Sequence, residues 1–125
     1  MTDKVITRLL PGGSPDGGMK PMGYIAADSV ADGVAHERGH MFFTNAAGNV
    51  NVVVWECTPC IEEVRDYPFD QCCFVLEGSL TITDQSGHAE TFELGDSYVI
   101  PRGFNGTWQM TEHYKNYFIT VEPEL

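Results

Sequence analysis

The sequence predicts an all-β protein built as an antiparallel sandwich or barrel. From about residue 40 onward, short β-branched and aromatic runs recur, and Gly and Asp interrupt them at spacings of about 8 to 12 residues. Helix signals are weak, since the best window, residues 26–36, is interrupted by Gly33. A chain of 125 residues has the length of a single domain.

The expected elements follow in chain order. Residues 11–23 are rich in glycine and proline and predict an irregular arm or surface loop. Residues 41–57 hold two strand-like runs around an Ala-Ala-Gly-Asn turn. Residues 72–101 hold three more, with breaks at EGS, DQSGH and LGD, and Gly87 suits the left-handed position of a hairpin turn. A last run covers residues 115–122.

The composition limits the possible partners. Eighteen acidic residues stand against seven basic ones, for a formal net charge of −11. Phosphate backbones and anionic lipids repel such a chain, so we expect neither nucleic acid nor a membrane as partner. The charge is typical of a solvated acidic surface that aids solubility, and alternatively its field could steer a cationic or amine ligand. No apolar run approaches membrane-spanning length, and the N-terminal residues lack a signal-peptide core. We expect a cytoplasmic location.

The four cysteines do not have the spacing of a zinc ribbon. One C-x-x-C, Cys57 and Cys60, is followed by the adjacent pair Cys72 and Cys73. Successive strand residues point to opposite faces, so Cys72 and Cys73 should not reach one metal. Buried or partly buried thiols are favoured over structural zinc or a redox role.

Residues 36–40 read HERGH and fit the zinc-protease pattern H-E-x-x-H. That chemistry needs His36 and His40 one helical turn apart. Gly33 and Gly39 interrupt the window, and Phe-Phe-Thr follows shortly, which favours a strand. In an extended chain the two histidines lie about 13 Å apart, too far for one ion. We predict that residues 36–40 lead into or begin a strand near the barrel edge.

Motif spacing gives the chain a family resemblance. Gly95, Pro101 and Gly103 fall at the fixed positions of G-x5-P-x-G-x2-H-x3-N, and Gln71 with Gly78 keeps the spacing of E-x6-G. On these residues the chain resembles the cupins, which implies a single-domain, RmlC-like jelly-roll barrel. We expect residues 1–36 to form an N-terminal arm with irregular or edge structure, and residues 37–125 to form the barrel.

Further stretches are similar to one group of cupins. They are WEC at 55–57, CCFVLEG at 72–78, LTITD at 80–84 and GDSYVIPRGFNGTW at 95–108. The group comprises small, uncharacterised single-domain members related to ureidoglycine aminohydrolase and the ethanolamine-utilisation cupin. This resemblance implies a small polar metabolite of amine, amino-acid or ureide type as ligand.

The usual cupin metal is held by two His and one Glu of the first motif and one His of the second. Here the first-motif histidine positions hold Val64 and Asp66, or Arg65 and Tyr67 if the spacing is one residue shorter. Gln71 stands at the glutamate position and Gly106 at the second-motif histidine. We therefore expect no cofactor and no metal at this site, with Asp66 and Gln71 as weak candidate ligands. His36, His40 or His113 would have to supply donors to any non-standard metal.

Strand alternation predicts which residues line a ligand pocket inside the barrel. If Gln71 points inward, Cys73 does so too, while Cys72 faces the other side. Tyr98, Trp108 and Met110 are expected in the interior, and Tyr117, Ile119 and Val121 on one common face of the last strand. The candidate ligand-binding residues are Gln71, Cys73, Tyr98, Trp108 and Met110, with Lys115 and Asp66 (or Arg65) supplying charge. Alternatively, the aromatic residues only fill the core and Lys115 is a surface lysine.

Three classes of function stay open. The first is a binder or sensor of a small molecule that works without the cupin metal. The second is an enzyme related to ureidoglycine aminohydrolase, with acid–base work by Asp66, Glu77 or Lys115. The third is a dimeric structural or interaction module. The cupin resemblance implies a homodimer with the Gly/Pro-rich arm near the interface.

Overall fold

The structure, a computed structural model, describes residues 5–123 of the chain. Within this part the backbone forms eleven strands and one short 3₁₀ helix, η1. In chain order the elements are β1 (Lys20–Pro21), η1 (Ala27–Ser29), β2 (Val30–Gly33), β3 (Glu37–Thr44), β4 (Val50–Cys57), β5 (Cys60–Val64), β6 (Asp70–Glu77), β7 (Ser79–Asp84), β8 (Ala89–Glu93), β9 (Ser97–Ile100), β10 (Gly106–Met110) and β11 (Tyr114–Val121).

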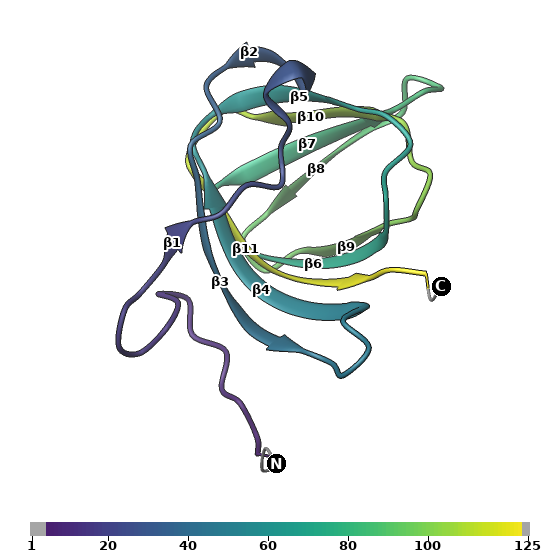
Figure 1. Ribbon diagram of the computed structural model, residues 1–125. Coiled ribbons are helices and arrows are strands. Elements are labelled where there is room, and N and C mark those ends of the chain that lie inside the picture. Colours follow the sequence, from purple (N-terminus) through teal and green to yellow (C-terminus); the bar gives the residue numbers. More distant parts are fainter. Residues whose placement is uncertain (1–4, 124–125) are drawn as a thin grey trace.

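Two antiparallel sheets form the walls of the barrel (Figure 1). One has six strands in the order β1-β3-β4-β11-β6-β9, and the other has five in the order β2-β5-β10-β7-β8. Chain neighbours β6 and β7 belong to different sheets, so the chain crosses between the layers there. This arrangement confirms the predicted all-β jelly roll.

The strand predictions are largely confirmed. The runs in 41–57 are β3 and β4, and the final run is β11. Residues 72–101 cover four strands, β6 to β9, and not three, because the LGD and DQSGH breaks each separate strands. Gly87 takes a φ of 91° in the β7–β8 hairpin, as predicted. The strands outside the expected runs are β1, β2, β5 and β10. Of these, β5 is a five-residue strand with two glutamates.

Residues before β3 contribute to both sheets. β1 pairs with β3, and β2 pairs with β5, so each adds an edge strand. Figure 1 shows the chain before β1 extending away from the barrel. In this arm Val5, Ile6 and Leu9 are exposed. No helix in residues 5–123 is long and apolar enough to cross a membrane.

Strand alternation separates an inner face from an outer face. On β6 the buried residues are Gln71, Cys73 and Val75, and on β11 burial alternates from Tyr114 onward. Each well-buried apolar side chain contributes roughly 1.5–3 kcal/mol to stability. The apolar residues that fill the interior are Val53, Trp55, Val64, Val75, Leu80, Ile100, Trp108, Met110 and Phe118.

The outer face of the six-stranded sheet is also apolar. Cross-strand pairing places Phe43, Val52, Ile119, Cys72 and Val99 in one row across five strands. Within this row Phe43 is 48% exposed and Val99 65% exposed. A monomer would leave these side chains in water.

Candidate functional site

Polar side chains form a hydrogen-bonded chain through the barrel interior. β6 alternation turns Gln71 and Cys73 inward, and Tyr67 lies in the loop that precedes this strand. The Tyr67 hydroxyl donates to Gln71 Oε1, and Gln71 Nε2 donates to Cys73 Sγ over 3.3 Å. Burial raises the pKa of Cys73 to about 12, against a lowering by its contacts with Tyr98 and Gln71. The thiol is therefore neutral at pH 7 and is not activated as a nucleophile.

This series of polar side chains continues on β9 and β11. Tyr98 lies directly across from Cys73 in the β6–β9 pair, and the hydroxyls of Tyr98 and Tyr114 lie 2.7 Å apart. Asn116 Nδ2 donates to the Tyr114 oxygen over 3.0 Å. Burial raises the pKa of both tyrosines, so both keep their protons at neutral pH. The interior thus carries a line of buried polar groups along the six-stranded sheet.

Glu62 adds a carboxyl group from the opposite sheet. It lies on β5 directly across from Trp108 on β10, and both side chains are buried. The Ser29 hydroxyl of η1 lies within hydrogen-bond distance of Glu62 Oε2, at 3.3 Å, and of the Ala26 carbonyl oxygen, at 2.8 Å. Burial raises the pKa of Glu62 to about 7, with the Ser29 hydrogen bond lowering it and the charge of Glu37 raising it. This carboxyl group therefore changes its charge near neutral pH.

Three buried polar atoms of the interior have no hydrogen-bond partner. Among the described residues they are Glu62 Oε1, Trp108 Nε1 and Asn116 Oδ1. Their residues are only 7%, 6% and 2% exposed. Buried polar groups in folded proteins nearly always have partners, and a group without one costs about 1–3 kcal/mol. Two acceptors and one donor are thus available to a bound molecule or to ordered water.

A cleft of about 470 Å³ leads to Glu62. Its volume is in the range of small-molecule sites, roughly 300–1,000 Å³. Residues from the N-terminal segment form one wall, and β5 with the following loop forms the other. The lining residues are Gly23, Tyr24, Ala26, Asp28, Ser29, Glu62, Glu63, Val64, Arg65, Tyr67, Pro68 and Phe69.

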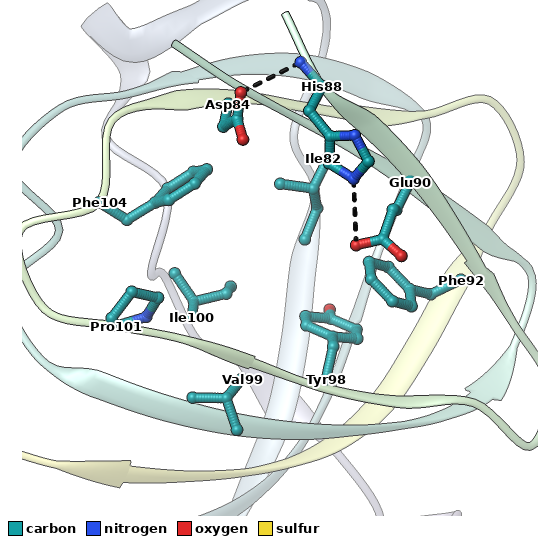
Figure 2. A pocket seen from close by; sticks show the side chains of 10 residues that line it. All are labelled: Ile82, Asp84, His88, Glu90, Phe92, Tyr98, Val99, Ile100, Pro101 and Phe104. Carbon is teal, nitrogen blue, oxygen red and sulfur yellow. Dashed lines mark hydrogen bonds and ion pairs between the residues drawn. The ribbon is translucent and has the colours of Figure 1, made fainter. Parts of the chain in front are cut away.

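A second, smaller cavity of about 130 Å³ lies between β7–β8 of one sheet and β9 of the other (Figure 2). Figure 2 shows Phe92 beside Tyr98 at one end, and their rings stack with centroids 4.4 Å apart. At the other end His88 donates its backbone N–H to Asp84 over 3.1 Å, and its ring lies 3.7 Å from Glu90. These polar residues are largely solvated, so the larger cleft is the better candidate for a ligand.

Glu37 anchors the N-terminal segment that forms one wall of the cleft. Its Oε1 accepts the backbone N–H groups of Tyr24, over 2.7 Å, and of Ile25, over 3.2 Å. The same oxygen accepts the Trp55 indole N–H over 3.0 Å. One carboxylate of β3 thereby holds residues 24–25 against the barrel, and η1, which carries Ser29, follows directly.

Comparison with known proteins identifies the family. The pattern of the EutQ-like cupin domain matches residues 44–118, more than half of the chain. The chain belongs to the cupins of this EutQ-like family. No curated protein matches it.

Solved structures agree on the cupin fold. A protein of unknown function from Pseudomonas syringae pv. tomato, of the DUF861 family, superposes with a TM-score of 0.78 at 17% identity, over 82% of this chain and 44% of that one. A putative ethanolamine utilization protein Q from Salmonella typhimurium gives 0.60 at 15% identity, over 70% of each chain. The Clostridium difficile EutQ protein gives 0.62 at 15% identity, over 78% of this chain and 79% of that one. The chain spans less than half of the Pseudomonas protein, and identities this low show the fold alone.

The residues at the usual cupin metal site do not fit a metal. Val64 is apolar and buried, and both functional ends of Gln71 are already hydrogen-bonded. At the second-motif histidine position, a Cβ on Gly106 would lie 2.2 Å from the Thr83 carbonyl oxygen and 2.7 Å from the Phe104 ring. A side chain there would collide with backbone, so these positions do not make a set of three or four donors. Nor do the described residues hold another cluster of three His, Cys, Asp or Glu suited to a metal.

The structure brings together five of the seven predicted site residues. Gln71, Cys73, Trp108 and Met110 are buried in the interior, and Tyr98 is half-buried beside them. Whether they bind a ligand stays a prediction.

The structure does not bring Lys115 and Asp66 into the interior. Lys115 stands between inward-facing Tyr114 and Asn116 on β11, so alternation turns it outward, and its Nζ lies 3.9 Å from Glu77. Asp66 lies in an exposed loop at a φ of 45°, where its backbone N–H bonds Asn105.

The histidines of HERGH lie on or beside a strand, as predicted. The backbone N–H of His36 bonds the Thr58 hydroxyl, and His40 faces outward with its ring 4.8 Å from that of Phe42. Strand β3 is second in its sheet, next to the two-residue edge strand β1. Glu37, between the histidines, serves as a structural acceptor.

Sequence reasoning missed Glu62, Tyr67 and the inner face of the last strand. Tyr117, Ile119 and Val121 do share a face, but it is the outer one, and Tyr114 and Asn116 line the interior. The signal for Glu62 was present in CIEEV, where alternate burial of Cys60, Glu62 and Val64 follows once the run is recognised as a strand.

Proposed function

We propose that this cupin binds a small polar metabolite, of amine, amino-acid or ureide type, inside its barrel and without the usual cupin metal. The observation that carries the proposal is the set of three unpartnered buried atoms, Glu62 Oε1, Trp108 Nε1 and Asn116 Oδ1. A cytoplasmic location is part of the same proposal.

The polar interior supports binding over simple core filling. A barrel that only needed packing would place apolar side chains at these positions, because unpaired polar groups destabilise it. The cleft is lined by Glu62, the residue that carries the first of the three atoms. A ligand carrying both donors and acceptors would satisfy the acceptor at Glu62 and the donor at Trp108. Amines, amino acids and ureides all contain such groups.

An enzyme is the second candidate, and one observation favours it. The pKa of Glu62 lies near 7, which suits a general acid or base at neutral pH. Exposed Asp66 and outward-facing Lys115 and Glu77, by contrast, lie outside the interior. Acid–base chemistry on a bound ureide or amine would therefore centre on Glu62.

A metal analysis and a thermal-shift screen of the full chain test the proposal. We expect sub-stoichiometric zinc, nickel, manganese and iron, and a melting temperature that rises with at least one of the three ligand classes. A ligand at one hundred times its Kd adds about 2.7 kcal/mol of stability, which such a screen detects. Stoichiometric metal in the barrel, or no shift with any class, would contradict the proposal. Turnover of the stabilising ligand would establish the enzyme.

We also propose a homodimer that buries the outer face of the six-stranded sheet. The apolar row from Phe43 to Val99 supports this, as does Phe74, which is 42% exposed on the same face. The exposed apolar residues Val5, Ile6 and Leu9 of the arm are suited to cover the same interface in a second copy.

A further inference from the structure

Glu62 lines the cleft, and one of its two oxygens is a buried hydrogen-bond acceptor without a partner. Oε2 lies 3.3 Å from the Ser29 hydroxyl, and Oε1 has no partner, although the residue is more than nine-tenths buried. The free position therefore calls for a single N–H or O–H donor from a molecule in the cleft.

Aromatic rings surround the approach to this oxygen. Tyr24, Tyr67 and Phe69 all line the cleft. The rings of Tyr67 and Phe69 meet edge to face with centroids 5.1 Å apart, and Tyr67 also contacts Trp108 with centroids 5.5 Å apart. Such ring faces attract a cation within about 6 Å, and the attraction grows when water is excluded.

The charges of the cleft favour a cation as well. Its walls carry Asp28, Glu62 and Glu63 against one basic residue, Arg65. Arg65 already pairs with Glu63 over 2.9 Å, so its charge is largely compensated. With Glu62 ionised the cleft has a net negative charge, in line with the whole chain at −11.

From this geometry we infer that the ligand is a protonated primary amine whose ammonium group donates to Glu62 Oε1 between the aromatic rings. The inference rests on the proposed function and narrows its ligand class. A guanidinium is planar and directs its paired donors at both carboxylate oxygens, of which only Oε1 lacks a partner. A quaternary ammonium has no N–H for Oε1. A neutral amide gains nothing from the ring faces or from the acidic walls.

Amine binding also fixes the protonation state of Glu62. The groups that interact with Glu62 are Glu37, Ser29 and Tyr67, the Cys57 thiol at the end of β4, and the Cys60 thiol on the same strand. Burial raises the pKa of both thiols and of the phenol, so these groups stay neutral near pH 7. Pairing with an ammonium stabilises the charged form of Glu62, so binding near pH 7 releases protons to the buffer.

Titration calorimetry of the full chain tests the inference. The probes are propylammonium, alanine, tetramethylammonium and propionamide, each at pH 7 in two buffers of different ionisation enthalpy. We expect propylammonium to bind at least tenfold more tightly than tetramethylammonium and propionamide, with proton release. Alanine shows whether the ammonium of an amino acid is accepted too, and tight alanine binding with proton release also supports the inference.

Two variants and a matched control locate the site. Glu62→Gln should weaken ammonium binding at least tenfold and abolish proton release, while Glu112→Gln, in the exposed turn before β11, should change neither. Phe69→Leu should weaken the ammonium two- to fivefold through loss of a ring face and leave a neutral ligand unaffected. A circular-dichroism melt confirms that each variant is folded.

The outcomes separate this inference from the proposed function. Equal binding of tetramethylammonium or propionamide, or an unchanged Kd in Glu62→Gln, overturns the amine inference. A neutral amide or ureide that binds tightly leaves the proposed function standing while the amine inference fails. If no probe and no member of the wider ligand screen binds, the proposed function itself fails.

Discussion

Glu62 is the residue that couples the interior to pH. Its pKa of about 7 means that the folded chain holds a proton which the unfolded chain has already lost above pH 5. The stability contributed by Glu62 is therefore fully present below about pH 4.5 and is lost as pH rises through about 7. The shift from 4.5 to about 7 corresponds to roughly 3 kcal/mol.

Glu62→Gln removes this loss because glutamine cannot ionise. We expect the ligand-free variant and the wild type to be nearly equally stable at pH 4.5. At pH 8.5 the variant should be more stable by up to about 3 kcal/mol. Urea unfolding at both pH values measures the difference in the free energy of unfolding between the two proteins. Contributions from groups that titrate equally in both proteins cancel in this difference. Glu63→Gln, at the exposed neighbouring position, should show no pH-dependent difference. Equal stability of variant and wild type at pH 8.5 would show that Glu62 is ionised without cost.

Glu56 shows the opposite behaviour on the outer face. Although burial alone would raise its pKa, hydrogen bonds and charge from Arg38 and His113 lower it overall. Its stabilising contribution is present above its usual pKa and is lost as pH falls. Acid therefore weakens the outer face of β3 and β4, whereas alkali weakens the interior at Glu62.

At the scale of elements, the segment before β3 depends on Glu37. One oxygen accepts the N–H groups of Tyr24, Ile25 and the Trp55 indole. In Glu37→Gln a single neutral amide oxygen replaces the carboxylate, so we expect a loss of about 1–3 kcal/mol. Hydrogen exchange should speed up at Tyr24 and Ile25 and stay slow in β4 and β11.

A matched change elsewhere gives the control for this prediction. Glu93→Gln alters an exposed carboxylate on β8 and should leave exchange at residues 24–25 unchanged. Protection at Tyr24 and Ile25 that survives in Glu37→Gln would mean that packing alone holds the segment.

For the whole molecule, the outer sheet face predicts the oligomeric state. We expect a mass of twice the 13.8 kDa chain in light scattering after size exclusion. Replacing Phe74 and Val99 by lysine places charges in the buried face and should yield the monomer. Val34→Lys, at a site 61% exposed beyond β2, should leave the dimer intact. A monomeric wild type, or a dimer that survives the double replacement, would rule out this interface.

The sequence by itself determined the fold and the two faces of most strands. Glycine and aspartate breaks separate β-branched runs, and alternation in a strand has a fixed period of two, so Gln71, Cys73 and Trp108 were placed inward correctly. Residues 36–40 (HERGH) were expected in a strand for a separate reason, because Gly33 and Gly39 disfavour a helix there. These are local properties of the sequence, and they can be recognised without knowing which strands pair with one another.

Only the tertiary structure decided which polar groups meet. Ser29 and Glu62 are 33 residues apart and lie in different elements, and Glu37 holds Tyr24 from a neighbouring strand. Lys115 looked available in the sequence, yet the register of β11 turns it outward. Such contacts arise from strand pairing and sheet packing over long separations, which alternation within one strand does not encode. The three unpartnered buried atoms that carry the proposed function, Glu62 Oε1 among them, could be identified only from the tertiary structure.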